Sequence, residues 1–288
     1  MQRIALIGVG LIVGSLARAL KASPEAENIH LCGYFRSSAA VAQALEIGIT
    51  DSATTSLAEA VAGADVVILG VPVGAIGDLL QQLKPYLGAA VVISDVGSTK
   101  GSVVAAAEAV FGQLPPRFIP GHPIAGTEKS GMSAALPDLF QQRRVILTPN
   151  ERSDRQAVGI IRHLWQLCGA EVVEMPVVRH DEVLAATSHL PHMLAYTLVD
   201  TLARLDEHDD IFRFAAGGFR DFTRIASSNP QMWHDICLNN RPALLKILQH
   251  FGHELARLAA AIEQGDGATL LRIFADAKMA RDNYSANH

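Results

Sequence analysis

The sequence predicts an α/β protein, a Rossmann-type domain with a mostly parallel sheet followed by an all-α helical domain. Two observations predict this fold class. In the N-terminal half, short β-rich runs alternate with Ala-rich helical runs, and strands separated by helices in this rhythm form right-handed βαβ crossovers in a parallel sheet. After Met175-Pro176 the β-rich runs stop and long helical runs follow, for instance at residues 181–204 and 242–264.

The predicted strands and helices alternate along the N-terminal half. Strands are expected at residues 3–7, 29–34, 66–71, 91–95, 118–120, 145–148 and 171–175. Helices are expected at residues 15–22, 39–47, 56–62, 76–86, 100–111 and 154–168. The change to helices near residues 176–180 predicts one domain over residues 1–177 and a second over residues 178–288, and a chain of 288 residues is long enough for two domains.

The first predicted strand runs into a glycine turn and then a helix. Such a turn lets backbone N–H groups approach a pyrophosphate, whose negative charge the helix N-terminus favours. We therefore predict that Gly8, Gly10, Leu11 and Ile12 bind a dinucleotide. Val13 stands where a third glycine usually allows close packing of helix and strand, so we expect this turn to shift or loosen.

Composition excludes several classes of protein. The formal net charge of −5, with no basic stripe, does not indicate nucleic-acid binding. No apolar run reaches the ~18 residues that a membrane span needs, and the apolar N-terminus fits a strand-to-helix turn better than a secretory signal. The three cysteines are widely spaced and lack metal-site spacing, which indicates reduced thiols in a cytoplasmic protein. With 18% charged residues and a mean hydropathy of +0.22, the chain is apolar enough to suggest an oligomer interface.

The end of the second predicted strand indicates which nicotinamide cofactor binds. An NAD enzyme usually places Asp or Glu about 20 residues beyond the glycines, where it holds the ribose hydroxyls. Phe35 takes that place here, and Arg36 and Ser37 follow. Because a carboxylate that would repel a 2′-phosphate is absent and Arg36 offers a positive charge, we predict NADP rather than NAD. Val71 and Pro72 stand at the end of the strand predicted at residues 66–71, and we expect them to lie along the nicotinamide ribose.

Two further loops follow predicted strands, one with Ser98 and one with His122. Each alone has an ordinary explanation, since Asp95 and Ser98 are typical caps for a helix that begins near Lys100 and His122 resembles any loop histidine. Together they place a hydroxyl and an imidazole at strand carboxyl ends beside a dinucleotide. These groups suit proton transfer coupled to hydride transfer, because a neutral imidazole accepts a proton near pH 7.

The helical half contains two clusters of titratable residues. His189 and His192 are three residues apart and share a helix face if Pro191 leaves the turn intact, but a metal site is not expected because no third ligand is obvious. Arg220 and Arg224 are i,i+4 neighbours, which is unfavourable without an anionic partner. They form either a solvated face or a clamp for a carboxylate.

Five motifs resemble the prephenate/arogenate (cyclohexadienyl) dehydrogenases, in order and over nearly the whole chain. They are Gly-x-Gly-Leu-Ile-x-Gly-Ser, Asp-Val-Gly-Ser-x-Lys, His-Pro-Ile-Ala-Gly-Thr-Glu-x-Ser-Gly, Ser-His-Leu-Pro-His and Gly-Phe-Arg-Asp-Phe-Thr-Arg-Ile-Ala. The resemblance implies NAD(P)-dependent oxidative decarboxylation of prephenate or arogenate in tyrosine biosynthesis by a homodimer. It also implies a dinucleotide-binding domain over residues 1–177 and a helical substrate and dimerisation domain over residues 178–288.

The resemblance also implies roles for individual residues. His122 matches the catalytic histidine bonded to the substrate's ring hydroxyl, and Ser98 matches the serine that helps to hold that hydroxyl. Arg224 matches the arginine that binds the substrate carboxylate, and Arg220 occupies a basic position of the same site. Pocket-lining, gating or wall positions are matched by His192, Glu128 and Trp233.

Two rival functions remain open on the sequence alone. One is another two-domain NAD(P)-dependent hydroxyacid or imine dehydrogenase, although such enzymes generally use a lysine or an acid from the helical domain. The other is a non-catalytic, nucleotide-sensing regulator, for which Val13 is the main argument.

Overall fold

The computed structural model describes residues 1–127, 129–206 and 208–287. The chain forms two compact units, Met1–Arg241 and Pro242–His288. The first unit contains both sheets and the helices up to α11, and the second contains most of α12 and all of α13.

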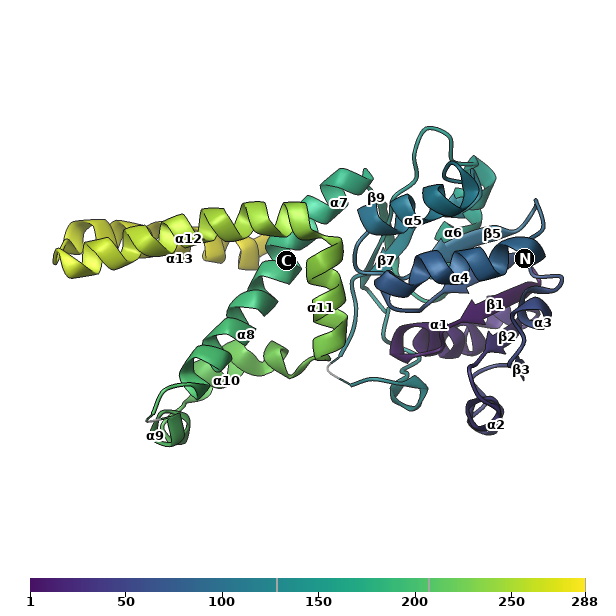
Figure 1. The fold of residues 1–288 in the computed structure, drawn as a ribbon, viewed down its shortest axis with the longest axis horizontal. Coiled ribbons are helices and arrows are strands. Elements are labelled where there is room, and N and C mark those ends of the chain that lie inside the picture. Colours follow the sequence, from purple (N-terminus) through teal and green to yellow (C-terminus); the bar gives the residue numbers. More distant parts are fainter. Residues whose placement is uncertain (128, 207, 288) are drawn as a thin grey trace. The chain divides into compact units, whose positions relative to one another are not determined.

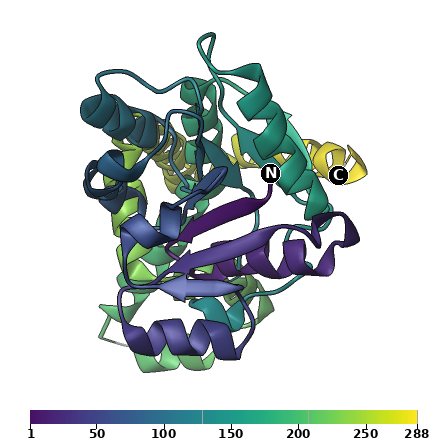
Figure 2. The ribbon, with the colours of Figure 1, turned by 90° about the vertical axis from the view of Figure 1, so that its right-hand side faces the viewer.

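A six-stranded parallel sheet forms the centre of the first unit (Figures 1 and 2). Its order is β3-β2-β1-β4-β5-β6. After β1 the chain adds β2 and β3 on one side of it and then adds β4, β5 and β6 on the other, so the strand order reverses between β1 and β4. The strands are β1 (Arg3–Ile7), β2 (His30–Tyr34), β3 (Ser52–Thr54), β4 (Val66–Leu69), β5 (Val92–Asp95) and β6 (Phe118–Ile119). This order is that of a dinucleotide-binding α/β sheet, whose ligands bind at the carboxyl ends of the strands beside the reversal.

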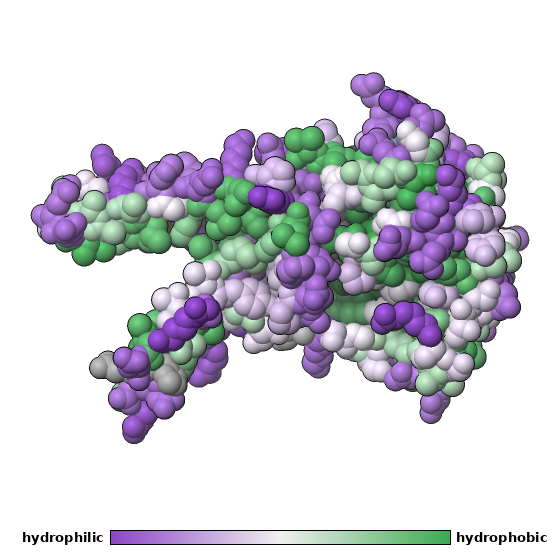
Figure 3. Space-filling view, in the orientation of Figure 1, coloured by the Kyte–Doolittle hydropathy of each residue, from purple (hydrophilic) through white to green (hydrophobic). Residues whose placement is uncertain are grey.

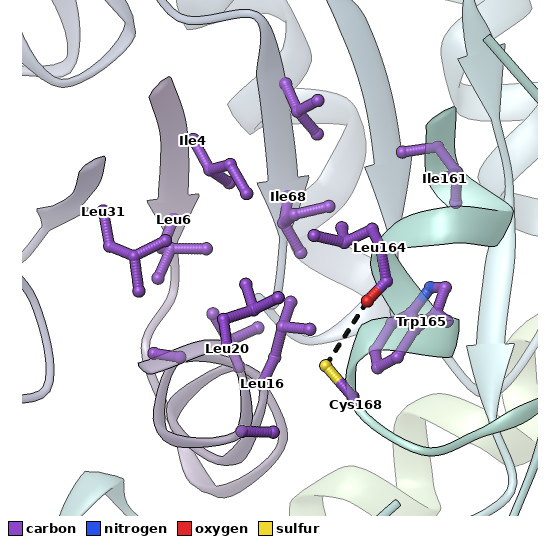
Figure 4. Packing of buried hydrophobic residues seen from close by; sticks show 14 of the residues in the cluster. Ile4, Leu6, Leu16, Leu20, Leu31, Ile68, Ile161, Leu164, Trp165 and Cys168 are labelled. Atoms are coloured by element: carbon purple, nitrogen blue, oxygen red, sulfur yellow. Dashed lines mark hydrogen bonds between the residues drawn. The ribbon is translucent and has the colours of Figure 1, made fainter. Parts of the chain in front are cut away.

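Helices cover both faces of this sheet because its strands are apolar on both sides. Ile4 and Leu6 of β1 belong to one core with α1 and α6, shown in Figure 4, whereas Ala5 and Ile7 belong to a second core with α3, α4 and α5. This alternation is the two-residue period of a strand. The helices are α1 (Leu11–Ala22), α2 (Ser38–Glu46), α3 (Leu57–Val61), α4 (Ile76–Leu83), α5 (Gly101–Phe111) and α6 (Arg155–Leu167).

A second, three-stranded sheet was not expected from the sequence. It has the order β7-β8-β9, with β7 (Gly121–Pro123) antiparallel to β8 (Arg144–Leu147) and β8 parallel to β9 (Glu171–Glu174). The predicted strand at residues 118–120 is therefore shorter, and the chain passes at Pro120 from β6 into β7. The sequence had suggested that His122 lies in a loop. It lies instead on the strand β7.

The remaining helices of the first unit follow β9, where the sequence predicts the change from strands to helices. They are α7 (Val177–Leu184), α8 (Leu190–Ala203), α9 (His208–Arg213), α10 (Gly217–Thr223) and α11 (Pro230–Asn239), with a 3₁₀ turn η6 (Arg224–Ser227). A π-helical turn, η5 (Ala185–His189), joins α7 to α8 just before Pro191. Because proline cannot donate a backbone hydrogen bond, a widened turn here costs little.

The second unit consists of α12 (Arg241–Glu263) without its first residue and of α13 (Gly267–Asn287). The two sheets with their helices, followed by helices alone, confirm the predicted fold class. In the part of the chain that the structure describes, no helix is both long and apolar enough to cross a membrane.

Candidate active site

The turn between β1 and α1 has the shape that a dinucleotide requires. Gly8 has φ +86°, and a Cβ there would lie 2.8 Å from the main chain of Gly70 and Val71, so a side chain does not fit. Gly10 directly precedes α1, and among the described residues no atom lies within 4 Å of the place that a Cβ on Gly10 would take. Gly10 has no side chain to cap the helix. The first amides of α1 therefore suit a pyrophosphate.

The other predicted cofactor residues lie at the same edge of the sheet. Leu11 and Ile12 begin α1 after β1, and Val71 and Pro72 follow β4. Because β1 and β4 are parallel neighbours, their carboxyl ends meet at the point where the strand order reverses. These residues fit a nicotinamide dinucleotide.

Val13 does not loosen the turn, and that expectation was wrong. Helix α1 begins at Leu11, directly after Gly10, and Val13 is only 1% exposed. The Cγ2 of Val13 lies 2.2 Å from the place that a Cβ on Gly70 would take. The room that a glycine in the helix usually provides is therefore provided by a glycine just after β4.

The end of β2 leads directly into the N-terminus of α2. Phe35 is buried and folds back, so that a Cβ on Gly33 would lie 2.5 Å from its ring. Arg36 and Ser37 are exposed, and the Ser37 hydroxyl caps α2 by accepting a hydrogen bond from the N–H of Ala40 at 3.3 Å. One exposed positive charge, that of Arg36, thus lies next to a helix N-terminus where the sequence predicts a 2′-phosphate.

A buried ion pair joins the loop after β5 to the start of β7. Lys100 Nζ donates to the Asp95 carboxylate and, at 2.6 Å, to the main-chain oxygen of Gly121, and both charged side chains are fully buried. Asp95 also accepts hydrogen bonds from the N–H groups of Gly97 at 2.8 Å and Gly121 at 3.2 Å. The two segments that carry the predicted catalytic residues are thereby fixed to each other.

Neither Asp95 nor Ser98 caps α5, so their interpretation as caps was wrong. Asp181 of α7 supplies the cap: its two carboxylate oxygens accept from the N–H groups of Lys100 and Gly101, both at 2.8 Å. Gly101 allows this approach, since a Cβ there would lie 2.8 Å from the carboxylate. The Ser98 hydroxyl is half-buried and, among the described residues, has no protein hydrogen-bond partner.

His122 is joined to α7 by a chain of hydrogen bonds. Its Nδ1 lies 2.9 Å from Nε2 of His180, and Nδ1 of His180 lies 2.8 Å from Oδ1 of Asp181. His180 is fully buried, and His122 is half-buried. The same carboxylate that caps α5 therefore ends the chain behind His122.

The surroundings of His122 keep its imidazole neutral. Burial lowers the pKa of His122 well below the ordinary 6.5, and the neighbouring basic groups of His180, Lys100 and His189 lower it further. Burial also lowers the pKa of His180, although the hydrogen bond to Asp181 acts in the opposite direction. A neutral imidazole can accept a proton from a bound hydroxyl.

A second cluster contains three of the predicted substrate residues. The ring of His192 stacks on that of buried Trp233, with centroids 3.7 Å apart. Arg224, at the start of η6, is close enough to lower the pKa of His192, although burial lowers this pKa more. The Tyr196 hydroxyl donates to the main-chain oxygen of Ser228 at 2.6 Å and so ties α8 to the end of η6.

His189 lies between the two clusters. Its ring centroid is 6.0 Å from that of Trp233, so His189 and His192 both face this indole. Its Nδ1 lies 3.1 Å from Nδ2 of Asn240, which also donates to the main-chain oxygen of Asp181 at 2.8 Å. The buried Nε2 of His189 has no partner in the described ranges, and burial lowers the pKa of this histidine to about 4.

Some predicted site residues are not brought into these clusters. Arg220 is exposed on α10, and within the described part of the chain its side chain has no polar contact with either cluster. Glu128 lies outside the described residues. Among the residues that the structure describes, no three His, Cys, Asp or Glu side chains are grouped as metal ligands.

Three residues of this site were not predicted from the sequence: Lys100, His180 and Asp181. A signal for the last two was present, because they are adjacent titratable residues directly after the change from strands to helices. Lys100 lies in the Asp-Val-Gly-Ser-x-Lys motif, but the sequence does not show that this lysine is fully buried.

Family models match almost the whole of the chain. The model for the nucleotide-binding domain of prephenate dehydrogenase matches residues 16–174, and the model for the dimerization domain of the same enzymes matches residues 176–276. The chain belongs to the prephenate dehydrogenase family. The family expected from the five motifs is therefore confirmed.

Individual members of the prephenate dehydrogenase family are similar to this chain over most of their length. The cyclohexadienyl dehydrogenase of Zymomonas mobilis is 40% identical over 290 residues, which cover 100% of this chain and 97% of that protein. The prephenate dehydrogenase of Bacillus subtilis is 39% identical over 283 residues, which cover 97% of this chain and 75% of that protein. The crystal structure of prephenate dehydrogenase from A. aeolicus, in complex with hydroxyphenyl propionate and NAD+, matches with a TM-score of 0.90 at 36% identity. The match covers 98% of this chain and 97% of that chain.

Proposed function

We propose that this member of the prephenate dehydrogenase family catalyses the NAD(P)-dependent oxidative decarboxylation of prephenate, arogenate or both, as a step in tyrosine biosynthesis. The observation that carries the proposal is the hydrogen bond from His122 to buried His180, which holds the imidazole on β7, next to the carboxyl end of β5 in the sheet that also bears the dinucleotide turn. The names of its relatives, a cyclohexadienyl and a prephenate dehydrogenase, support the choice of substrates.

The proposed substrate is a cyclohexadiene with a carboxylate on one ring carbon and a hydroxyl on the opposite carbon. A bound nicotinamide supplies the acceptor for the hydride of the hydroxyl-bearing carbon. His122 accepts the hydroxyl proton as the C–O bond becomes a carbonyl, and Ser98 holds the same oxygen. The bond to the carboxylate then breaks, carbon dioxide leaves, and its electron pair makes the ring aromatic, so the reaction is effectively irreversible.

The second cluster is proposed to hold the substrate's carboxylate. Arg224 offers a guanidinium, which binds carboxylates in a planar, two-bonded geometry. The stacked rings of His192 and Trp233 form a wall beside it, and Trp233 is buried. Arg220 is proposed as an accessory positive charge, and Glu128 as a gating residue.

We further propose that NADP is preferred over NAD. Arg36 and Ser37 stand at the N-terminus of a nine-residue helix, where a phosphate is favoured, and Phe35 replaces the usual carboxylate. The complex of the A. aeolicus relative contains NAD+, so this preference would distinguish the two enzymes.

A homodimer in the cytoplasm completes the proposal. Residues 176–276 match a dimerization domain, and Figure 3 shows apolar surface along α12 and α13. The exposed apolar side chains there are Leu245, Leu255, Ile262, Leu271, Phe274 and Met279. All three cysteines are free thiols. Light scattering of the purified chain at micromolar concentration is expected to give twice the mass of 30.8 kDa.

Turnover of both substrates with both cofactors tests the proposed function. We expect turnover of at least one substrate, with kcat/KM for NADP at least tenfold above that for NAD. A tenfold preference for NAD would contradict the cofactor proposal alone. Cofactor binding without turnover of either substrate would instead favour the nucleotide-sensing regulator, and turnover of a hydroxyacid or an imine would favour the other dehydrogenases.

A further inference from the structure

Two residues of α7, buried His180 and half-buried Asp181, contact the catalytic region, and neither was predicted as a site residue. Asp181 receives four hydrogen bonds: from His180 Nδ1 at 2.8 Å, from the N–H groups of Lys100 and Gly101 at 2.8 Å each, and from Asn240 Nδ2 to its main-chain oxygen at 2.8 Å. The other nitrogen of His180 reaches His122. Helix α7 is thereby joined both to the imidazole and to the start of α5.

The order of donors and acceptors along this chain fixes the positions of the protons. An ionised carboxylate only accepts, so His180 donates to Asp181 from Nδ1. A neutral His180 then has a lone pair on Nε2 and accepts the hydrogen bond at 2.9 Å from Nδ1 of His122. His122 must therefore carry its proton on Nδ1, and the lone pair of its Nε2 remains for a substrate.

We propose that His180 and Asp181 form a positioning pair that holds His122 in its Nδ1–H tautomer, so that Nε2 is the atom that accepts the proton. Asp181 performs a second task at the same time, because its hydrogen bonds to Lys100 and Gly101 fix the end of the loop that carries Ser98. The hydroxyl and the imidazole are then aligned by one carboxylate. The catalytic consequence rests on the proposed function, whereas the tautomer does not.

The charged and titratable groups around His122 come from several elements. From α7 and η5 come His180, Asp181 and His189; Lys100 lies at the start of α5 and Asp95 at the end of β5. The positive charge of Lys100 is balanced by its buried partner Asp95. The carboxylate of Asp181 is therefore the group that determines the direction of the hydrogen bonds in this chain.

The tautomer can be measured without any ligand or activity. The full chain is labelled with ¹⁵N-histidine, and the His122 signals are identified as those lost in His122→Asn. At neutral pH we expect Nδ1 at the position of a protonated ring nitrogen and Nε2 at that of an unprotonated one. The opposite assignment, with the proton on Nε2, overturns the proposal.

Asp181→Asn tests the consequence for catalysis. An amide at this place can donate as well as accept, so the tautomer of His180, and with it that of His122, is no longer fixed. We expect a mixture of His122 tautomers and a kcat about 10–100-fold lower, as is typical when a partner that orients a functional histidine is removed. The dissociation constant of NADP, which depends on the turn before α1, should not change.

The pH profile separates orientation from simple protonation. The loss in Asp181→Asn is expected at every pH of the activity plateau, because a wrongly oriented neutral ring is not corrected by removing protons. Recovery of wild-type kcat at high pH would overturn the proposal, as would an unchanged kcat. The matched control is Glu182→Gln, the same change at the next residue of α7, where the carboxylate pairs with exposed Arg179 and is not in the chain to His122.

A pair of variants at His180 keeps the proposal testable if Asp181→Asn folds poorly. The amide oxygen of His180→Gln can still accept from Nδ1 of His122, whereas His180→Leu cannot. We expect His180→Gln to retain about tenfold more kcat than His180→Leu, and equal losses would contradict the positioning role. If the wild type turns over neither substrate, the proposed function fails, but the tautomer of His122 still decides the inference.

Discussion

The two clusters of the candidate site are built in different ways. Around His122, charged and polar side chains from β5, β7, α7 and the N-cap of α5 are buried or half-buried and are paired with one another. Around Arg224, the cluster is formed by rings from α8 and α11 and by the four-residue turn η6, and the arginine is exposed. The first cluster is fixed by hydrogen bonds within the protein, and the second places an exposed positive charge near the stacked rings of His192 and Trp233.

This difference indicates that one cluster serves proton transfer and the other serves substrate binding. Proton transfer needs a base held in one orientation before the substrate arrives, and buried hydrogen bonds provide that at a cost in desolvation. Binding of a carboxylate needs a guanidinium that the ligand can reach, and an exposed arginine meets this need. Changes in the first cluster should therefore lower kcat or stability, and changes in the second should raise KM.

The largest expected effect is that of His122→Asn. Loss of the general base should lower kcat about 10³-fold, within the usual contribution of 10²–10⁴ for such a group. NADP should bind as before, because the cofactor turn is unchanged. Steady-state kinetics and fluorescence titration measure the two quantities, and His163→Asn on the exposed side of α6 is the control. Unchanged turnover would remove His122 from the mechanism.

Lys100→Met should cost the most stability. It leaves Asp95 as an unpaired buried carboxylate, and breaking such a pair typically costs about 3–5 kcal/mol. Urea unfolding measures the change, with Arg179→Met on the surface of α7 as the control. The double variant Lys100→Met/Asp95→Asn should be more stable than the single one because the unpaired charge is gone. A single variant as stable as the control would show that the pair does not fix this region.

Arg224→Gln should act mainly on substrate binding. Loss of a charged hydrogen-bond donor to a carboxylate typically costs about 1.5–3 kcal/mol, so KM should rise about 10–100-fold while kcat changes less. Arg224→Lys should recover part of this loss, since it keeps the charge but not the planar fork. Arg213→Gln on α9 is the matched control. A fall in kcat with an unchanged KM would show that the two clusters do not divide the work in this way.

The smallest effect is expected at the cofactor's ribose. Arg36→Gln should lower kcat/KM for NADP about tenfold, because the arginine is exposed and its pairing with a phosphate is worth about 1.5 kcal/mol. The value for NAD should not change. Equal effects on both cofactors would place Arg36 away from the 2′-phosphate.

Much of the fold follows from local sequence patterns, but the links between distant segments do not. The alternation of strands and helices and the glycine turn predict the parallel sheet, since each is encoded within a few residues. The second sheet was missed because β7 has three residues and pairs with a strand more than twenty residues later. Val13 looked disruptive because the glycine that accommodates it, Gly70, follows another strand, β4, far along the sequence.

The candidate site shows the same limit. Motifs identify His122, Ser98 and Arg224, and the structure places His192, Trp233 and Arg224 together. The residues behind His122 depend on a contact between β7 and α7, 58 positions apart, which no local pattern contains.

The dependence of kcat/KM on pH tests the central claim that His122 is a neutral base held by its buried partners. This base works only when deprotonated, so activity is present above its pKa in the free enzyme and is lost as the pH falls through it. Since burial lowers that pKa well below the ordinary 6.5, the acidic limb of the profile is predicted well below pH 6.5. It should be absent from the residual activity of His122→Asn. An acidic limb at or above pH 6.5, or one that persists in His122→Asn, would contradict the account.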